Sequence, residues 1–211
     1  MTDPGRQAYD DVASAARRIA AEGLVVGTGG NVSLRVGDGP DAPVLVTRSG
    51  VDLAACGPDD VVLVGGPGTP TSELELHLGV QADTGAAAVV HVHAPWSTAV
   101  ACVLDELPVV HYQQLLLGGA VRVAPYATFG SPELATGVRA AMAGRQAALL
   151  ANHGAVTVGA DLGQAVERAL LLEWLCALHH RASALGTPRV LTDQQQAAVV
   201  EAALRTYGGA S

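Results

Sequence analysis

The amino-acid sequence predicts one α/β domain over residues 1–211, with strands in the middle of the chain and helices on both sides. Three observations predict it. Segments with helical spacing of apolar residues lie near both ends, short β-rich runs separated by Gly- and Pro-containing turns lie between them, and no repeat or long linker divides the chain. A chain of 211 residues is long enough to bury a sizeable core.

The first half of the chain begins with a predicted helix over 7–22, where apolar side chains share one face and a glycine follows. Ser72 is a predicted N-cap for a helix to about Ala82, and Pro95 ends one strand and starts the next helix. The strands predicted here are Asn31–Val36, Pro43–Thr47, Asp60–Val64 and Ala87–His93, and the helix after Pro95 is Trp96–Val103.

The second half contains two more short strands around residues 108–128 and then a helix that starts at Ser131 and Pro132. Two apolar runs split by Asn152-His153-Gly154 predict a hairpin or tight strand connection. The helix at Ser131 is expected to reach about Ala143, and the two apolar runs are the predicted strands Ala147–Ala151 and Ala155–Val158. A long helix, Leu162–Leu185, and a last helix follow. The last helix starts from a capping box at Thr192 and reaches about Thr206.

Composition restricts the function. The net charge of −8 without a basic run is unsuited to nucleic acid, although backbone N–H groups could still bind a small anionic substrate. Only 15% of residues are charged and 3% aromatic, and this Ala-rich surface suggests that other subunits cover part of it. Three scattered cysteines, no signal-peptide pattern and no apolar run of membrane-spanning length predict a soluble cytoplasmic protein.

The strongest chemical signal is His91-Val92-His93. On a strand, residues i and i+2 point to the same face, so both imidazoles can bind one metal ion. His153, displayed where an apolar strand breaks, supplies the third nitrogen that a catalytic zinc site needs. Each histidine alone is equally compatible with a hydrogen-bonded structural role, and His77, His111, His179 and His180 do not improve on this choice.

Glu73 stands at the start of a predicted helix, where an acid complements the helix dipole. It could also be a general acid/base and a metal ligand before substrate arrives. The glycine-rich segment 27–33, together with Ser49-Gly50 and Thr71-Ser72, offers backbone and side-chain donors to an anion, although each is also compatible with an ordinary turn.

Taken together, these motifs resemble the class II aldolase/adducin family over nearly the whole chain. The matching motifs, in order, are GGNVS at 29–33, SG at 49–50, TSE at 71–73, HVH at 91–93, HY at 111–112, GG at 118–119, APYATFGS at 124–131, NHG at 152–154 and TYG at 206–208. The resemblance implies a three-layer α/β/α fold with a mixed, mostly antiparallel sheet, and a homotetramer with active sites at the subunit interfaces.

The resemblance also implies roles for particular residues. His91, His93 and His153 would bind one zinc ion per subunit, which Glu73 also contacts in the resting enzyme while serving as the catalytic acid/base. Tyr112, from a neighbouring subunit, would orient or protonate the aldehyde half, and Tyr207 would close over the site. The substrate phosphate would be held by Gly30, Asn31, Ser49, Gly50, Thr71 and Ser72.

The implied reaction is reversible cleavage of a ketose 1-phosphate, such as L-fuculose 1-phosphate, to dihydroxyacetone phosphate and an aldehyde. Zinc would stabilise an enediolate, and Glu73 would exchange the proton on the ketose carbon if burial raises its pKa. Two features leave the substrate open. Arg48 precedes the SG pair and either turns inward to an anionic group or stays solvated, and the bulky segment 113–117 would shape the aldehyde pocket.

Other reactions on the same site remain open. A methylthioribulose-phosphate dehydratase would use a similar zinc site, and a decarboxylase would be signalled by an inward Arg48. A pentulose-phosphate epimerase tends to carry Asp where this chain has Glu73. A metal-free adducin-like interaction module would be expected to lack the zinc ligands, which are all in place here.

Overall fold

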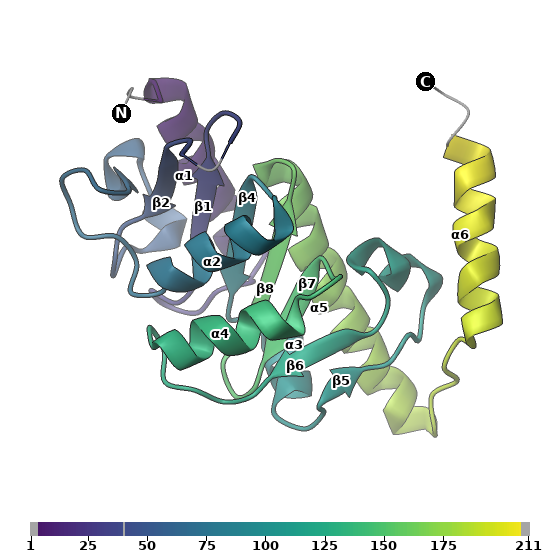
Figure 1. Cartoon of the computed structure of the whole chain (residues 1–211). Helices are drawn as coiled ribbons and strands as arrows, with labels where there is room; N and C mark the ends of the chain where they lie inside the picture. Colours follow the sequence, from purple (N-terminus) through teal and green to yellow (C-terminus); the bar gives the residue numbers. More distant parts are fainter. Residues whose placement is uncertain (1–3, 40, 208–211) are drawn as a thin grey trace.

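A sheet of eight strands forms the middle layer of the computed structural model, which describes residues 4–39 and 41–207. The strands lie in the order β3-β2-β1-β4-β8-β7-β6-β5 (Figure 1), and every neighbouring pair is antiparallel except β6 and β7. Their bounds are β1 Asn31–Arg35, β2 Val44–Thr47, β3 Val61–Leu63, β4 Ala88–Val92, β5 Glu106–Leu107, β6 Val121–Ala124, β7 Ala147–Leu150 and β8 Gly154–Gly159.

Helices cover both faces of the sheet. Helices α1 (Arg6–Ala21), α3 (Pro95–Ala101) and α5 (Leu162–Leu185) pack on one face, and α2 (Leu74–Thr84) and α4 (Pro132–Ala141) pack on the other. Each face has its own core of buried apolar residues. The predicted α/β/α fold with a mixed, mostly antiparallel sheet is therefore confirmed.

The last helix, α6 (Asp193–Tyr207), stands to one side of the three layers in Figure 1. It contacts the chain mainly at the 3₁₀ turn η3 (Tyr112–Leu117). Two further 3₁₀ turns, Leu53–Ala55 and Pro58–Asp60, lie between β2 and β3. The predicted capping box of α6 is present, since Thr192 and Gln195 exchange side-chain and backbone hydrogen bonds.

The central strand β4 shows how the sequence pattern places the site. A strand with helices over both faces is buried on both sides, which is why β4 reads as an almost continuous apolar run. Val90 and Val92 point into the core beneath α1, α3 and α5, whereas Val89 points toward α2 and α4. His91 shares the face of Val89, so its imidazole is directed toward α2.

Most predicted elements are present within two residues of their expected bounds, but one local expectation is wrong. The two short strands expected around residues 108–128 are β5 and β6, which flank η3, where the Gln114 side chain binds the backbone of Leu107 and Val110. Helix α2 has Glu73, not Ser72, at its N-cap, and its start is held by Thr71, whose hydroxyl accepts a hydrogen bond from the Glu73 N–H.

Among the described residues, no helix is both long enough and apolar enough to cross a membrane.

Candidate active site

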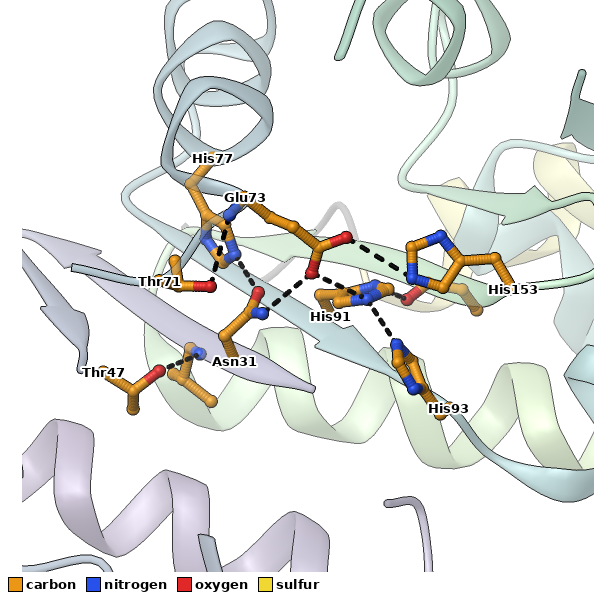
Figure 2. A network of polar contacts seen from close by, with 10 residues as sticks. Asn31, Thr47, Thr71, Glu73, His77, His91, His93 and His153 are labelled. Carbon is orange, nitrogen blue, oxygen red and sulfur yellow. Dashed lines mark hydrogen bonds and ion pairs between the residues drawn. The ribbon is translucent and has the colours of Figure 1, made fainter. Parts of the chain in front are cut away.

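Four side chains from separate parts of the chain converge on one point (Figure 2). They are Glu73 at the start of α2, His91 within β4, His93 just after β4, and His153 in the turn between β7 and β8. Their ligand atoms all lie within 4.8 Å of one another. The structure therefore brings together the four residues that the sequence singles out as metal ligands.

Strand pairing accounts for this convergence. Strand β4 lies between β1 and β8, with Asn31 opposite His91 and Ala155 opposite Val92. The turn that carries His153 precedes β8 directly, so the end of β4 lies beside it. Asn152 adopts a left-handed conformation in this turn (φ 55°), which asparagine tolerates better than most residues.

His91 is held in one tautomer. Its Nδ1 lies 3.0 Å from the Ala155 carbonyl oxygen, which can only accept a hydrogen bond, so Nδ1 carries the proton. The Nε2 atom is thereby left with its lone pair directed at the other ligands. A backbone carbonyl that orients a histidine in this way is a usual second partner of a metal ligand.

The donor set fits a divalent metal ion. The Nε2 atoms of His91 and His93 lie 2.9 Å apart, and Glu73 Oε2 lies 3.1 Å from His91 Nε2. Glu73 Oε1 is buried without a hydrogen-bond partner among the described residues and lies 3.4 Å from His153 Nε2. Three imidazole nitrogens and one carboxylate around a common point match the ligands of a catalytic zinc site.

The charges of the site follow from burial and mutual contact. Burial lowers the pKa of His93 to about 4, with His91 and His153 adding to the effect, and it also lowers the pKa of His153. These rings are therefore neutral at neutral pH, as metal ligation requires.

The pKa of Glu73 corrects an expectation. Burial does raise it, but the nearby His91 ring and the hydrogen bond donated by the Asn31 amide outweigh burial, so the net pKa falls well below its ordinary value. In the metal-free chain Glu73 is thus a carboxylate, the form that binds a cation.

A cavity of about 310 Å³ adjoins the four ligands. Glu73, His93 and His153 form part of its wall, together with all six residues predicted to hold a phosphate: Gly30, Asn31, Ser49, Gly50, Thr71 and Ser72. These residues come from three loops that are far apart in the sequence, and only the fold places them in one cavity.

Arg48 also lines this cavity, but its guanidinium pairs with Asp60 at 2.8 Å and remains half-exposed.

The two tyrosines expected at the site do not line this cavity within the described part of the chain. Tyr112 lies in η3 with its ring against His111 and is not among the residues that line the cavity. Tyr207 is the last residue of α6, and its side chain lies outside the described part of the chain, as does Gly208 of the same motif.

Two residues of the site are missing from the sequence-based assignment. Phe129 lines the cavity with 69% of its surface exposed, and the APYATFGS motif that contains it was the available signal. His77 is fully buried behind the ligands and bonded to Asn31, a position that a histidine in an apolar helix does not reveal by itself.

The close packing of the site leads to a prediction for Gly154. A Cβ atom at this position would lie 2.2 Å from the Val92 carbonyl oxygen and 3.1 Å from the His93 ring. Gly154→Ala should therefore cost about 1–3 kcal/mol of stability and displace His93. Thermal unfolding and metal content would measure both effects, with Gly57→Ala as the comparison, because Gly57 has a φ of −104° and a Cβ there would meet its nearest atom, Asp60 Oδ2, at 3.8 Å. Unchanged unfolding of Gly154→Ala would contradict the packing.

The fold and the buried three-histidine, one-carboxylate centre define a metal-dependent enzyme acting in a small polar cavity. The profile of the Class II Aldolase and Adducin N-terminal domain matches residues 10–180. This chain belongs to the class II aldolase/adducin family, and it is a class II aldolase, a metal-dependent aldehyde-lyase.

Individual relatives agree with this assignment. The chain is 39% identical to a 5-methylthioribulose-1-phosphate/5-deoxyribulose-1-phosphate aldolase of Rhodospirillum rubrum, over 92% of this chain and 89% of the relative. It is 35% identical to the L-fuculose phosphate aldolase of Escherichia coli K12, over 88% of each chain. A solved L-fuculose 1-phosphate aldolase structure superimposes with a TM-score of 0.86 at 31% identity, covering 94% of this chain and 96% of the other.

Proposed function

We propose that this protein is a zinc-dependent aldolase that reversibly cleaves a ketose 1-phosphate to dihydroxyacetone phosphate and an aldehyde. The observation that carries the proposal is that three of the metal ligands, Glu73, His93 and His153, line the same cavity as the six residues predicted to hold the phosphate. The names of the relatives, all sugar-phosphate aldolases, support the same substrate class.

Different residues serve different steps of the reaction. When bound by the three histidines, the metal supplies Lewis acidity to the carbonyl group of the ketose. The backbone and hydroxyl donors of Ser49, Gly50 and Ser72 bind the phosphate and fix the reacting carbons. In cleavage, the C4 hydroxyl loses its proton as the C3–C4 bond breaks and the aldehyde leaves, and Glu73 Oε1, the oxygen without a hydrogen-bond partner, delivers one proton to C3 of the remaining fragment. One proton lost at the C4 oxygen thus matches one gained at C3, and condensation reverses both transfers.

The aldehyde half of the substrate should end in an apolar group. Phe129 presents its ring to the cavity, where a methyl or methylthio group could pack against it. L-fuculose 1-phosphate, 5-deoxyribulose 1-phosphate and 5-methylthioribulose 1-phosphate, the substrates in the relatives' names, all end in such a group. These three are therefore the substrates to test first.

The alternative reactions of the family receive less support. An inward Arg48 would favour a decarboxylase, but Arg48 is paired with Asp60. Glu73, where the epimerases tend to carry Asp, favours an aldolase. A dehydratase remains the nearest competitor because it would use the same metal centre, but its product keeps all the carbons together.

The proposal includes a homotetramer with interfacial sites. Tyr112, Leu116 and Trp174 expose 54%, 63% and 45% of their surfaces, a grouping of large apolar side chains that a second subunit would cover. In that assembly Tyr112 of one subunit would reach the cavity of its neighbour. A closed ring of four identical subunits uses two complementary faces of each subunit, and this patch would be one of them.

The experiment is a cleavage assay on zinc-loaded protein with the three ketose 1-phosphates, coupled to detection of dihydroxyacetone phosphate. We expect release that stops with a chelator and returns with zinc. A dehydrated product without dihydroxyacetone phosphate would identify the dehydratase reaction instead, and no turnover of any of the three would refute the substrate class.

A further inference from the structure

Behind the metal ligands, five buried polar side chains form one continuous chain. Helix α2 contributes Glu73, His77 and Gln81, which are spaced by four and so share one helix face. Strand β1 contributes Asn31 and Ser33, which are spaced by two and so share one strand face. All five are at most 5% exposed.

The two sets interleave. Asn31 Nδ2 lies 2.9 Å from Glu73 Oε2, and Asn31 Oδ1 lies 2.5 Å from His77 Nε2, as Figure 2 shows. Ser33 Oγ lies 2.7 Å from His77 Nδ1 and 3.4 Å from Gln81 Nε2. The order of contacts is therefore Gln81, Ser33, His77, Asn31 and Glu73, alternating between helix and strand.

The direction of this chain is set at its far end. Gln81 Nε2 also lies 2.9 Å from the Ala87 carbonyl oxygen, which can only accept a hydrogen bond. The Gln81 amide therefore presents its N–H₂ group to both partners, and Gln81 Oε1 is left buried without a partner among the described residues. The opposite orientation would place Oε1 against the Ala87 carbonyl oxygen, with two acceptors facing each other, so the observed one holds although it leaves a buried oxygen unpartnered.

The other directions follow from the Glu73 end. An ionised carboxylate only accepts, so Asn31 Nδ2 donates to Glu73 Oε2 and Asn31 Oδ1 faces His77 Nε2. His77 Nε2 therefore carries the proton that it donates to Asn31 Oδ1, and Nδ1 of the neutral ring accepts from the Ser33 hydroxyl. Ser33 Oγ in turn accepts from Gln81.

The surroundings of His77 favour this neutral form. The ring is completely buried, and burial lowers its pKa to about 3, so it is uncharged at neutral pH. A neutral imidazole has one donor and one acceptor, which is what a one-way chain needs at this position.

We propose that His77 is a positioning residue for the aldolase reaction: its Nε2–H tautomer locks the Asn31 amide, which holds Glu73 Oε2 and leaves Oε1 without a hydrogen bond on the side of His153. The inference rests on the proposed function of Glu73. It assigns a direction to every hydrogen bond of the network, and it separates the anchored oxygen of Glu73 from the reactive one.

The tautomer can be observed without any turnover. In protein with ¹⁵N-labelled histidine, His77 should show a protonated Nε2 and an unprotonated Nδ1, identified by comparison with His77→Gln. A proton on Nδ1 would overturn the proposal, whether or not the protein cleaves any of the substrates. This measurement can therefore refute the role of His77 without bearing on the proposed function.

The consequence for catalysis is tested with matched variants. His77→Phe keeps a ring but no hydrogen-bonding group and should lower kcat about 10- to 100-fold, with KM changed less than about twofold and metal content retained. His77→Gln, which restores a donor and an acceptor, should recover most of kcat. Ser33→Ala, one link further away, should lower kcat less than His77→Phe.

Thr157→Val is the control for loss of a buried hydroxyl. Thr157 is fully buried and donates to the Ala165 carbonyl on the opposite face of the sheet, outside the chain of contacts. Thr157→Val should leave kcat near that of the unchanged protein.

Two outcomes would contradict the proposal. If His77→Phe retains full kcat, or if His77→Gln is as impaired as His77→Phe, His77 does not position Glu73. If His77→Phe does not fold, His77→Gln and the labelled-histidine spectrum decide the matter.

Discussion

Replacing His93 with alanine is expected to remove the metal and the activity together. His93 supplies one of three imidazole nitrogens, and its Nε2 lies 2.9 Å from His91 Nε2 at the centre of the cluster. Catalytic zinc usually needs three protein ligands, and in the proposed reaction Glu73 serves as a ligand only until it acts as the acid/base. Without His93, only two histidines would hold the ion during turnover, so it should be bound far more weakly. Loss of Lewis acidity removes several kcal/mol of stabilisation, which corresponds to a fall in turnover of about 10³-fold or more.

Metal content per subunit, measured by mass spectrometry after desalting, tests this directly. His179→Ala is the matched control, because it removes a histidine on α5 that lies outside the ligand cluster. That variant should keep one metal ion per subunit and its activity. Retention of the metal by His93→Ala would mean that His93 is not a ligand.

Replacing Glu73 with glutamine should also remove turnover, but unlike His93→Ala it should leave the metal ion and the fold in place. The three histidines remain, and the amide has the same shape as the carboxylate. The amide cannot take up a proton at neutral pH, so turnover should fall by about 10²-fold or more, the usual scale for loss of a general acid/base.

Glu75→Gln provides the control for this change. Glu75 lies in the first turn of the same helix but is exposed to solvent, so its replacement removes the same charge from α2 without touching the cavity. Steady-state kinetics of the two variants, with unfolding temperature and metal content, separate a catalytic effect from a structural one. Full activity of Glu73→Gln would remove Glu73 from the mechanism.

Local patterns in the sequence were sufficient for much of this structure. The apolar periodicities of residues 7–22 and 162–185 predicted α1 and α5. The strand predicted over Ala87–His93 placed His91 and His93 on one face, because the side-chain period of a strand is two wherever the strand lies. These properties depend on residues that are close in sequence.

Local patterns failed where a distant contact decided the outcome. The pKa of Glu73 is lowered, against the expectation from burial, because the fold brings His91 and Asn31 against its carboxylate. These three residues are far apart in sequence, so their effect on one another cannot be found within a short window of sequence.

The sequence by itself determined the family, the four candidate ligands and the faces on which they lie, since motif order and periodicity are properties of the chain alone. Only the tertiary structure decided that Asn31 and Ser33 interleave with His77 and Gln81. Spacings of two and four place residues on a face, but they do not say which strand a helix covers or in what register. That choice is made by packing α2 against the sheet beside β4, and it determines which oxygen of Glu73 is anchored and which is free.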